Sequence, residues 1–177
     1  MRKILLAVVL TMVHLPAFAG CPSWTIEAPE GSRYAQRFTR ASAHIPIVLR
    51  VLAEEGLGAQ WVYLMLAESG GKYDAVSGPG AGGLWQLMPA TARAYGCGDI
   101  LDVECSTRAA ARYLTRLIRE FKTVKDVVTA YNMGGHNFRR LGRPTAQAVA
   151  LAHEVACLVE HDPLNLIRNK ELIYGNE

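Results

Sequence analysis

The sequence has neither a cluster of lysines and arginines nor a long uninterrupted hydrophobic run, and each absence excludes a class of function. Its 19 basic and 16 acidic residues give a formal net charge of only +3 over 177 residues. Without a basic patch, the chain lacks the signature of a nucleic-acid-binding protein. Its N-terminal apolar stretch is interrupted by Thr11, His14 and Pro16, so it is too short for a stable membrane-spanning helix.

The sequence also lacks the spacings that mark metal and phosphate sites. Its five histidines and four cysteines show no metal-ligand spacing. His153-Glu154 has no second histidine four residues after the first, so it is not a zinc-protease motif. The glycine-rich residues 78–83 are not followed by the Lys-Ser/Thr pair of a phosphate-binding loop. We therefore expect a protein with no metal and no cofactor.

The first 19 residues have the pattern of a secretory signal. Arg2 and Lys3 give a basic start, residues 4–10 an apolar core, and Ala17-Phe18-Ala19 a small-x-small cleavage site. Cleavage after Ala19 would leave ample chain for one compact domain. We expect an exported protein with a signal peptide at 1–19, an irregular N-terminal arm at 20–42, a domain at 43–162 and a C-terminal tail at 163–177.

All four cysteines follow the expected cleavage site, and an even number in an exported chain suggests two disulfides. Cys97 and Cys105 are close in sequence and flank a short loop, so we pair them, which leaves Cys21 to pair with Cys157. The alternative is a lipoprotein signal in which Cys21 is acylated. Phe18 stands where such signals usually carry leucine, and acylation would leave an odd thiol, so the disulfide is favoured.

Apolar residues recur at helical spacing through most of the chain. Pro46 suits the first turn of a helix that runs to about Glu55. Residues 59–69 are apolar nearly all round, which is typical of a buried central helix. Further helices are expected at 89–95, from Ser106 as a cap to residue 121, at 124–133 and at 145–160. The pattern predicts a mainly α fold with at most a small β element near residues 70–85.

Glu68 is the most unusual residue of the expected central helix. It shares a helix face with Trp61, Leu64 and Met65, so it is expected to lie where the core meets a polar loop. Burial disfavours the carboxylate anion and raises the pKa, so such a group stays protonated near neutral pH and can act as an acid. Taken alone, a solvent-exposed glutamate at a helix end is the simpler interpretation, but the neighbouring motifs favour the catalytic one.

Three ordered motifs resemble the soluble lytic transglycosylase (SLT) domain family. They are Glu68-Ser69 with Ala75 and Ser77 downstream, then Gly83-Leu-Trp-Gln-Leu-Met-Pro-Ala-Thr-Ala92, then Ala130-Tyr-Asn-x-Gly134. The tryptophan at position 85 makes the membrane-bound lytic transglycosylase D type the closest likeness. The resemblance covers roughly residues 45–151. It implies a mainly α (α+β), goose-type-lysozyme-like fold and an enzyme that cleaves peptidoglycan in the periplasm.

The resemblance also implies roles for individual residues. Glu68 would be the catalytic acid/base. The substrate-binding residues would be Ser69, Ser77, Gln86, Met88, Tyr131 and Asn132. Ser77 and Tyr131 would hydrogen-bond near the carboxyl group or the substrate, and Gln86 and Met88 would line the sugar groove. For Met88 and Tyr131, packing in the core is the competing interpretation.

A single carboxyl group is sufficient for the family's reaction. Glu68 would protonate the oxygen between N-acetylmuramic acid (MurNAc) and N-acetylglucosamine (GlcNAc), and the muramyl C6 hydroxyl would close on C1 to give a 1,6-anhydro sugar. Most glycosidases use two carboxyl groups, and the nearest other one, Asp74, is expected in a turn. A hydrolytic muramidase and a non-catalytic glycan-binding module remain alternatives.

One departure from the family lies after the Tyr-Asn motif. Related domains often carry a Glu-Thr pair where this chain has Pro144-Thr-Ala-Gln147, and Glu154 is a candidate replacement. The small size further suggests a monomer that opens the wall for an envelope-spanning secretion or conjugation complex, with peptidoglycan glycan strands as substrate. The preference between endo and exo cleavage stays open.

Overall fold

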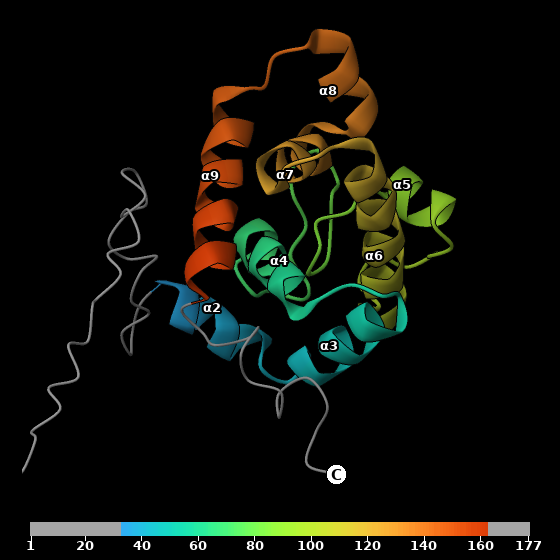
Figure 1. The fold of residues 1–177 in the computed structure, drawn as a ribbon. Coiled ribbons are helices and arrows are strands. Elements are labelled where there is room, and N and C mark those ends of the chain that lie inside the picture. The colour runs from blue at the N-terminus through green and yellow to red at the C-terminus, as the bar shows by residue number, and fades with distance from the viewer. Residues whose placement is uncertain (1–32, 163–177) are drawn as a thin grey trace, which may run out of the picture.

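Helices form most of the chain that the computed structural model describes, which is residues 33–162 (Figure 1). Their bounds are α2 (Arg33–Ala41), α3 (Ile45–Glu54), the 3-10 helix η1 (Ala59–Trp61), α4 (Val62–Ser69), α5 (Pro89–Ala94), α6 (Val103–Glu120), α7 (Val124–Met133), α8 (Gly135–Leu141) and α9 (Ala146–His161). The expected signal peptide, the C-terminal tail and most of the N-terminal arm lie outside the described residues. Within that range, no helix is long and apolar enough to cross a membrane.

The loop between α4 and α5 is the only departure from helical structure that carries β pairing in residues 33–162. It contains no full strand, but Val76 pairs with Gly82 and Gly82 with Leu87 in isolated antiparallel bridges. At Gly83, φ is +72° and a Cβ atom would lie 2.1 Å from the carbonyl oxygen of Ile100, so the close approach of the two segments requires glycine. The predicted mainly α fold with a small β element is confirmed.

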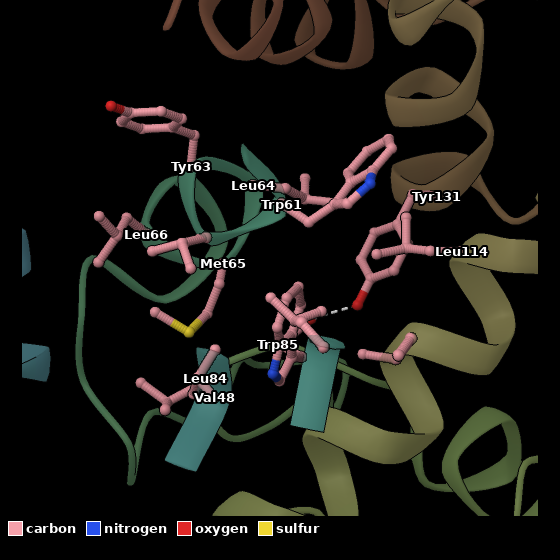
Figure 2. Packing of buried hydrophobic residues seen from close by; sticks show 14 of the residues in the cluster. Val48, Trp61, Tyr63, Leu64, Met65, Leu66, Leu84, Trp85, Leu114 and Tyr131 are labelled. Carbon is pink, nitrogen blue, oxygen red and sulfur yellow. Dashed lines mark hydrogen bonds between the residues drawn. The ribbon is translucent and has the colours of Figure 1, made fainter. Parts of the chain in front are cut away.

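Helix α4 lies at the centre of the domain, with α2, α3, α6, α7 and α9 arranged around it (Figure 1). All five residues at 62–66 are fully buried, as their uniformly apolar character predicts. The hydroxyl of Tyr63, the one polar group among them, donates a 2.7 Å hydrogen bond to Asp162. Leu84 and Trp85 from the loop belong to the same buried cluster, and Figure 2 shows Met65 of α4 beside Leu84. The core and the loop therefore support each other.

Two helices differ from the sequence-based expectation: α6 begins earlier than expected, and α8 was not expected at all. Helix α6 starts after Asp102, whose carboxylate accepts from the backbone nitrogen of Cys105 at 2.7 Å. Ser106 is buried inside the helix, so the expectation that it caps this helix is wrong. Aspartate is at least as good an N-cap as serine and comes first along the chain.

The expected irregular arm is helical over its described part, α2. Tyr34 of this helix is buried, and its hydroxyl donates to the carboxylate of Glu154 on α9. Arg37 lies 3.5 Å from the same carboxylate. A nine-residue helix is marginal by itself, and these tertiary contacts supply the stability that the local sequence lacks.

The first of the two expected disulfides is confirmed. Cys97 and Cys105 are bonded, with their Cα atoms 5.3 Å apart, and the bond closes the loop between α5 and α6. Cys157 is also disulfide-bonded. Its expected partner, Cys21, lies outside the described residues, so that pairing and the alternative of acylation stay predictions.

Candidate active site

A cleft of about 640 Å³ opens where the loop after α4 faces the junction of α7 and α8. Its lining side chains come from six helices and the loop between α4 and α5. They are Glu68, Ser77, Pro79, Ala81, Gln86, Leu87, Met88, Thr91, Tyr113, Tyr131, Asn132, Met133, Gly134, Asn137 and Gln147. The cleft therefore brings together segments that are about 80 residues apart in sequence.

Glu68 is the only carboxyl group among the side chains that line this cleft in the described chain. It stands on the last turn of α4, and its Oε1 atom is buried without a hydrogen-bond partner. Burial raises the pKa of Glu68 to about 7, against the opposing effect of a hydrogen bond from Asn132, which favours the anion. At neutral pH the group therefore exchanges readily between its acid and base forms.

Tyr131 lines the same cleft and is close enough to this carboxyl group to feel its charge. Its hydroxyl donates a 2.9 Å hydrogen bond to the carbonyl oxygen of Trp85, which Figure 2 draws as a dashed line. Burial, and then the nearby charge of Glu68, raise the pKa of Tyr131 well above its usual value. The phenol is thus neutral at physiological pH, and its position is fixed by the loop that carries the second motif.

Gln86 has an unusual backbone conformation for a residue with a side chain. Its φ is +46°, in the left-handed region. Its amide nitrogen donates to the carbonyl oxygens of Ala75 (3.1 Å) and Gly83 (3.0 Å). The nitrogen is occupied, so the amide oxygen is the atom available to accept from a ligand N–H group. Strain of this kind is common at functional sites.

Ser77 and Met88 both line the cleft, as the resemblance implies. The Ser77 hydroxyl oxygen accepts from the backbone nitrogen of Ala81 at 2.9 Å, which closes the turn beside the cleft and leaves the hydroxyl hydrogen able to donate. Met88 is 43% exposed, so the competing interpretation of core packing is wrong for this residue. Tyr131, by contrast, is buried in the core and also reaches the cleft.

Two residues proposed from the sequence lie elsewhere. Ser69 is buried and does not line the cleft; its hydroxyl donates to the Met65 carbonyl and accepts from the Gly71 nitrogen, which stabilises the end of α4. We therefore correct its assignment from substrate contact to helix termination. Glu154 does not line the cleft either, because it pairs with Tyr34 and Arg37, so it does not replace the missing family glutamate.

The structure adds lining residues that the sequence did not indicate, including Thr91, Tyr113, Asn137 and Gln147. Tyr113 belongs to the apolar stripe of α6, so the sequence pattern indicated a core residue and gave no sign that it also lines the cleft. Gln147 is the last residue of the segment that occupies the place of the Glu-Thr pair in related domains. This alignment was the one feature of the sequence that could have indicated a role at the site. Among residues 33–162, no three His, Cys, Asp or Glu side chains gather as a metal site would require.

A comparison with known protein families matches the part of the chain that forms most of this cleft. The model of the transglycosylase SLT domain matches residues 56–150, a span that contains Glu68, Gln86, Tyr131 and Asn132. Domains of this family are lysozyme-like and have lytic transglycosylase activity on peptidoglycan. The match covers more than half of the sequence, and the chain therefore belongs to the transglycosylase SLT domain family.

Proposed function

We propose that this chain is a lytic transglycosylase of the membrane-bound D type that cleaves the β-1,4 bond between MurNAc and GlcNAc, with Glu68 as its single acid/base. One observation carries the proposal: a buried carboxyl group with a pKa of about 7 faces a cleft in which the described chain places no second carboxylate. A retaining or inverting glycosidase would need that second group.

In the first step, protonated Glu68 donates its proton to the bridging oxygen. The bond from this oxygen to C1 of MurNAc breaks, and GlcNAc leaves with a free 4-hydroxyl group. Protonation of the leaving group is the task for which a carboxyl pKa near 7 is suited. The hydrogen bond from Asn132 becomes stronger as the carboxylate forms, because an ionised acceptor binds an N–H group more tightly.

In the second step, the Glu68 carboxylate takes the proton from the C6 hydroxyl of the same MurNAc, and the C6 oxygen bonds to C1. The product is 1,6-anhydro-MurNAc, Glu68 is protonated again, and no water is consumed. The attacking hydroxyl is already tethered to the sugar, so correct placement supplies much of the acceleration. Tyr131 and Ser77 both line the cleft, and we expect the neutral phenol and the serine hydroxyl to hydrogen-bond the reacting groups.

We further propose that the protein is exported to the periplasm after loss of residues 1–19 and acts there as a monomer. The Cys97–Cys105 disulfide supports an oxidising compartment. A small enzyme that cuts glycan strands would suit local opening of the wall for an envelope-spanning secretion or conjugation complex. Recovery of the enzyme without any such complex after cross-linking in producing cells would count against this last role.

The decisive experiment digests purified sacculi with the mature chain and identifies the new sugar ends by mass spectrometry. We expect anhydro-MurNAc ends from the wild type, and a loss of about 10²–10⁴-fold in rate for Glu68→Gln. Reducing ends without anhydro-MurNAc would instead indicate a hydrolytic muramidase. Binding of glycan with no cleavage would indicate a non-catalytic module, and undiminished activity of the variant would remove Glu68 from its role.

A further inference from the structure

The hydroxyl of Tyr113 bridges the two sides of the corner between α7 and α8. It accepts from the backbone nitrogen of Gly135 at 3.2 Å and donates to the carbonyl oxygen of Ala130 at 3.4 Å. Ala130 directly precedes Tyr131 and Asn132, and Gly135 begins α8. A side chain of α6 thus holds the segment that carries two of the candidate site residues.

Other contacts also hold this corner, among them an ion pair of 3.0 Å between Arg139 of α8 and Glu120 of α6. Helix α7 ends at Met133, and the next residue, Gly134, has backbone angles (φ +81°, ψ 126°) that favour glycine. The carbonyl groups of a final helical turn need hydrogen-bond partners outside the helix. Asn137 supplies one by donating to the Met133 carbonyl at 3.1 Å. Gly135 packs so closely on α6 that a Cβ atom would lie 3.0 Å from Leu117.

The ring of Tyr113 also supports Tyr131 directly. It lies between the rings of Tyr95 and Tyr131, with centroid separations of 5.4 Å and 5.3 Å. Tyr113, the middle ring of this stack, is only 8% exposed and lines the cleft, as Tyr131 does. At the outer end, the hydroxyl of Tyr95 accepts from Arg116 at 3.2 Å and does not reach the cleft lining. Tyr95 therefore belongs to the same stack as Tyr113 but lies outside the cleft lining.

We propose that Tyr113 is a positioning residue, whose hydroxyl holds the α7–α8 corner so that Asn132 stays against the carboxyl group of Glu68. This inference rests on the proposed role of Glu68 as the acid. Phenylalanine at position 113 would keep the ring stack and lose both hydroxyl contacts, which isolates the bridge from the packing.

The consequence can be measured at Glu68 itself. The Asn132 hydrogen bond lowers the pKa of Glu68 against the effect of burial. A loosened corner weakens that bond, so the pKa of Glu68 rises further. The decline in activity at high pH then moves to higher pH, while kcat falls because the acid is less well oriented. A purely structural role for Tyr113 would lower the melting temperature without moving this titration.

The test compares Tyr113→Phe with the matched control Tyr95→Phe in the mature chain. For Tyr113→Phe we expect kcat to fall about threefold to tenfold, as loss of a hydrogen bond would produce, with little change in KM and with the alkaline limb at higher pH. Tyr95→Phe should match the wild type. Asn132→Ala should shift the limb in the same direction, and adding Tyr113→Phe to it should shift it no further.

Titration of 13C-labelled glutamate by nuclear magnetic resonance gives a readout that does not require activity. The Glu68 signal, assigned by its loss in Glu68→Gln, should titrate at a higher pH in Tyr113→Phe than in the wild type. An unchanged Glu68 titration in Tyr113→Phe would overturn the inference, whatever the melting temperature does. A wild type that cleaves no glycan would contradict the proposed function and would leave this titration as the deciding measurement.

Discussion

At the scale of single residues, the chemistry of Glu68 follows from its place at the boundary of the core. The five residues before Ala67 on α4 are buried and uncharged, and the helix ends at Ser69, one residue after Glu68. The carboxyl group is therefore withdrawn from water but still reaches the cleft. Desolvation, the larger of the two influences on its pKa, depends on this position, whereas the Asn132 contact only moderates it.

This position predicts how the rate depends on pH. Free Glu68 must be protonated to act as the acid, and its pKa is about 7. We expect kcat/KM to be constant on the acid side of this value and to fall about tenfold per pH unit above it. Steady-state rates on soluble glycan strands between pH 5 and 9 test this. An alkaline limb near pH 4.5, the ordinary range of a solvated glutamate, would contradict the assignment.

Gln86 predicts a contrast in stability between two substitutions. A non-glycine residue in the left-handed region costs about 1–2 kcal/mol, and glycine avoids most of this cost. Gln86→Ala and Gln86→Gly both lose the contacts to Ala75 and Gly83, so the difference between them reports the backbone alone. We expect the glycine variant to be more stable by about 1 kcal/mol in urea unfolding. Equal stability would mean that the backbone relaxes at this position.

At the scale of elements, helix α9 has two roles: its start contributes to the cleft, and its middle contacts α2. Its first turn carries Gln147 at the rim of the cleft, and Glu154, about two turns later, pairs with Tyr34 and Arg37 of α2. The same helix therefore contributes to the site at one end and fastens the N-terminal helix at the other. Thr145 caps it by accepting from the nitrogen of Ala148 at 3.1 Å.

This division predicts opposite effects of two substitutions on α9. Glu154→Gln should leave kcat/KM within about twofold but lower the free energy of unfolding by about 1–2 kcal/mol, because a buried phenol keeps a weaker partner. Gln147→Ala should leave stability unchanged and lower kcat/KM about threefold to tenfold. Both are measured by denaturant unfolding and by rates on glycan strands. Loss of activity in Glu154→Gln at full stability would restore Glu154 as a catalytic candidate.

At the scale of the whole molecule, the disulfides bear on the proposal that the protein is exported. Residues 97 and 105 are bonded and Cys157 is bonded as well, which fits a protein that folds outside the reducing cytoplasm. The N-terminal signal expected from the sequence would deliver the chain there. The alternative fate of Cys21 as an acylated residue would tether the enzyme to a membrane and change where it meets the wall.

Intact-mass measurement of the exported protein distinguishes these fates. We expect a chain that begins at Gly20, carries no acyl group and gains four hydrogens on reduction, one pair for each disulfide. A mass increased by an acyl group on a chain that begins at Cys21 would establish the lipoprotein instead. A Cys21→Ser variant serves as the control, since it should lose one disulfide and remain free of lipid.

Sequence alone was sufficient for features that depend on neighbours in the chain. The uniform apolar character of residues 59–69 predicted a buried helix, and the lone Glu68 at its end predicted a raised pKa. Helical periodicity predicted α3, α4, α5, α7 and α9 to within a few residues. These are local properties, because the period of the hydrophobic pattern and the chemistry of a cap are set within a few turns.

Only the tertiary structure decided which residues meet. Ser69 directly follows Glu68, but its hydroxyl hydrogen-bonds to the backbone of α4 and does not line the cleft. Gln147, nearly 80 residues away, does line it. Glu154 was a plausible replacement on sequence grounds but instead contacts Tyr34 and Arg37 of α2. Side-chain direction and long-range pairing depend on how the helices pack around α4, and no local pattern contains that information.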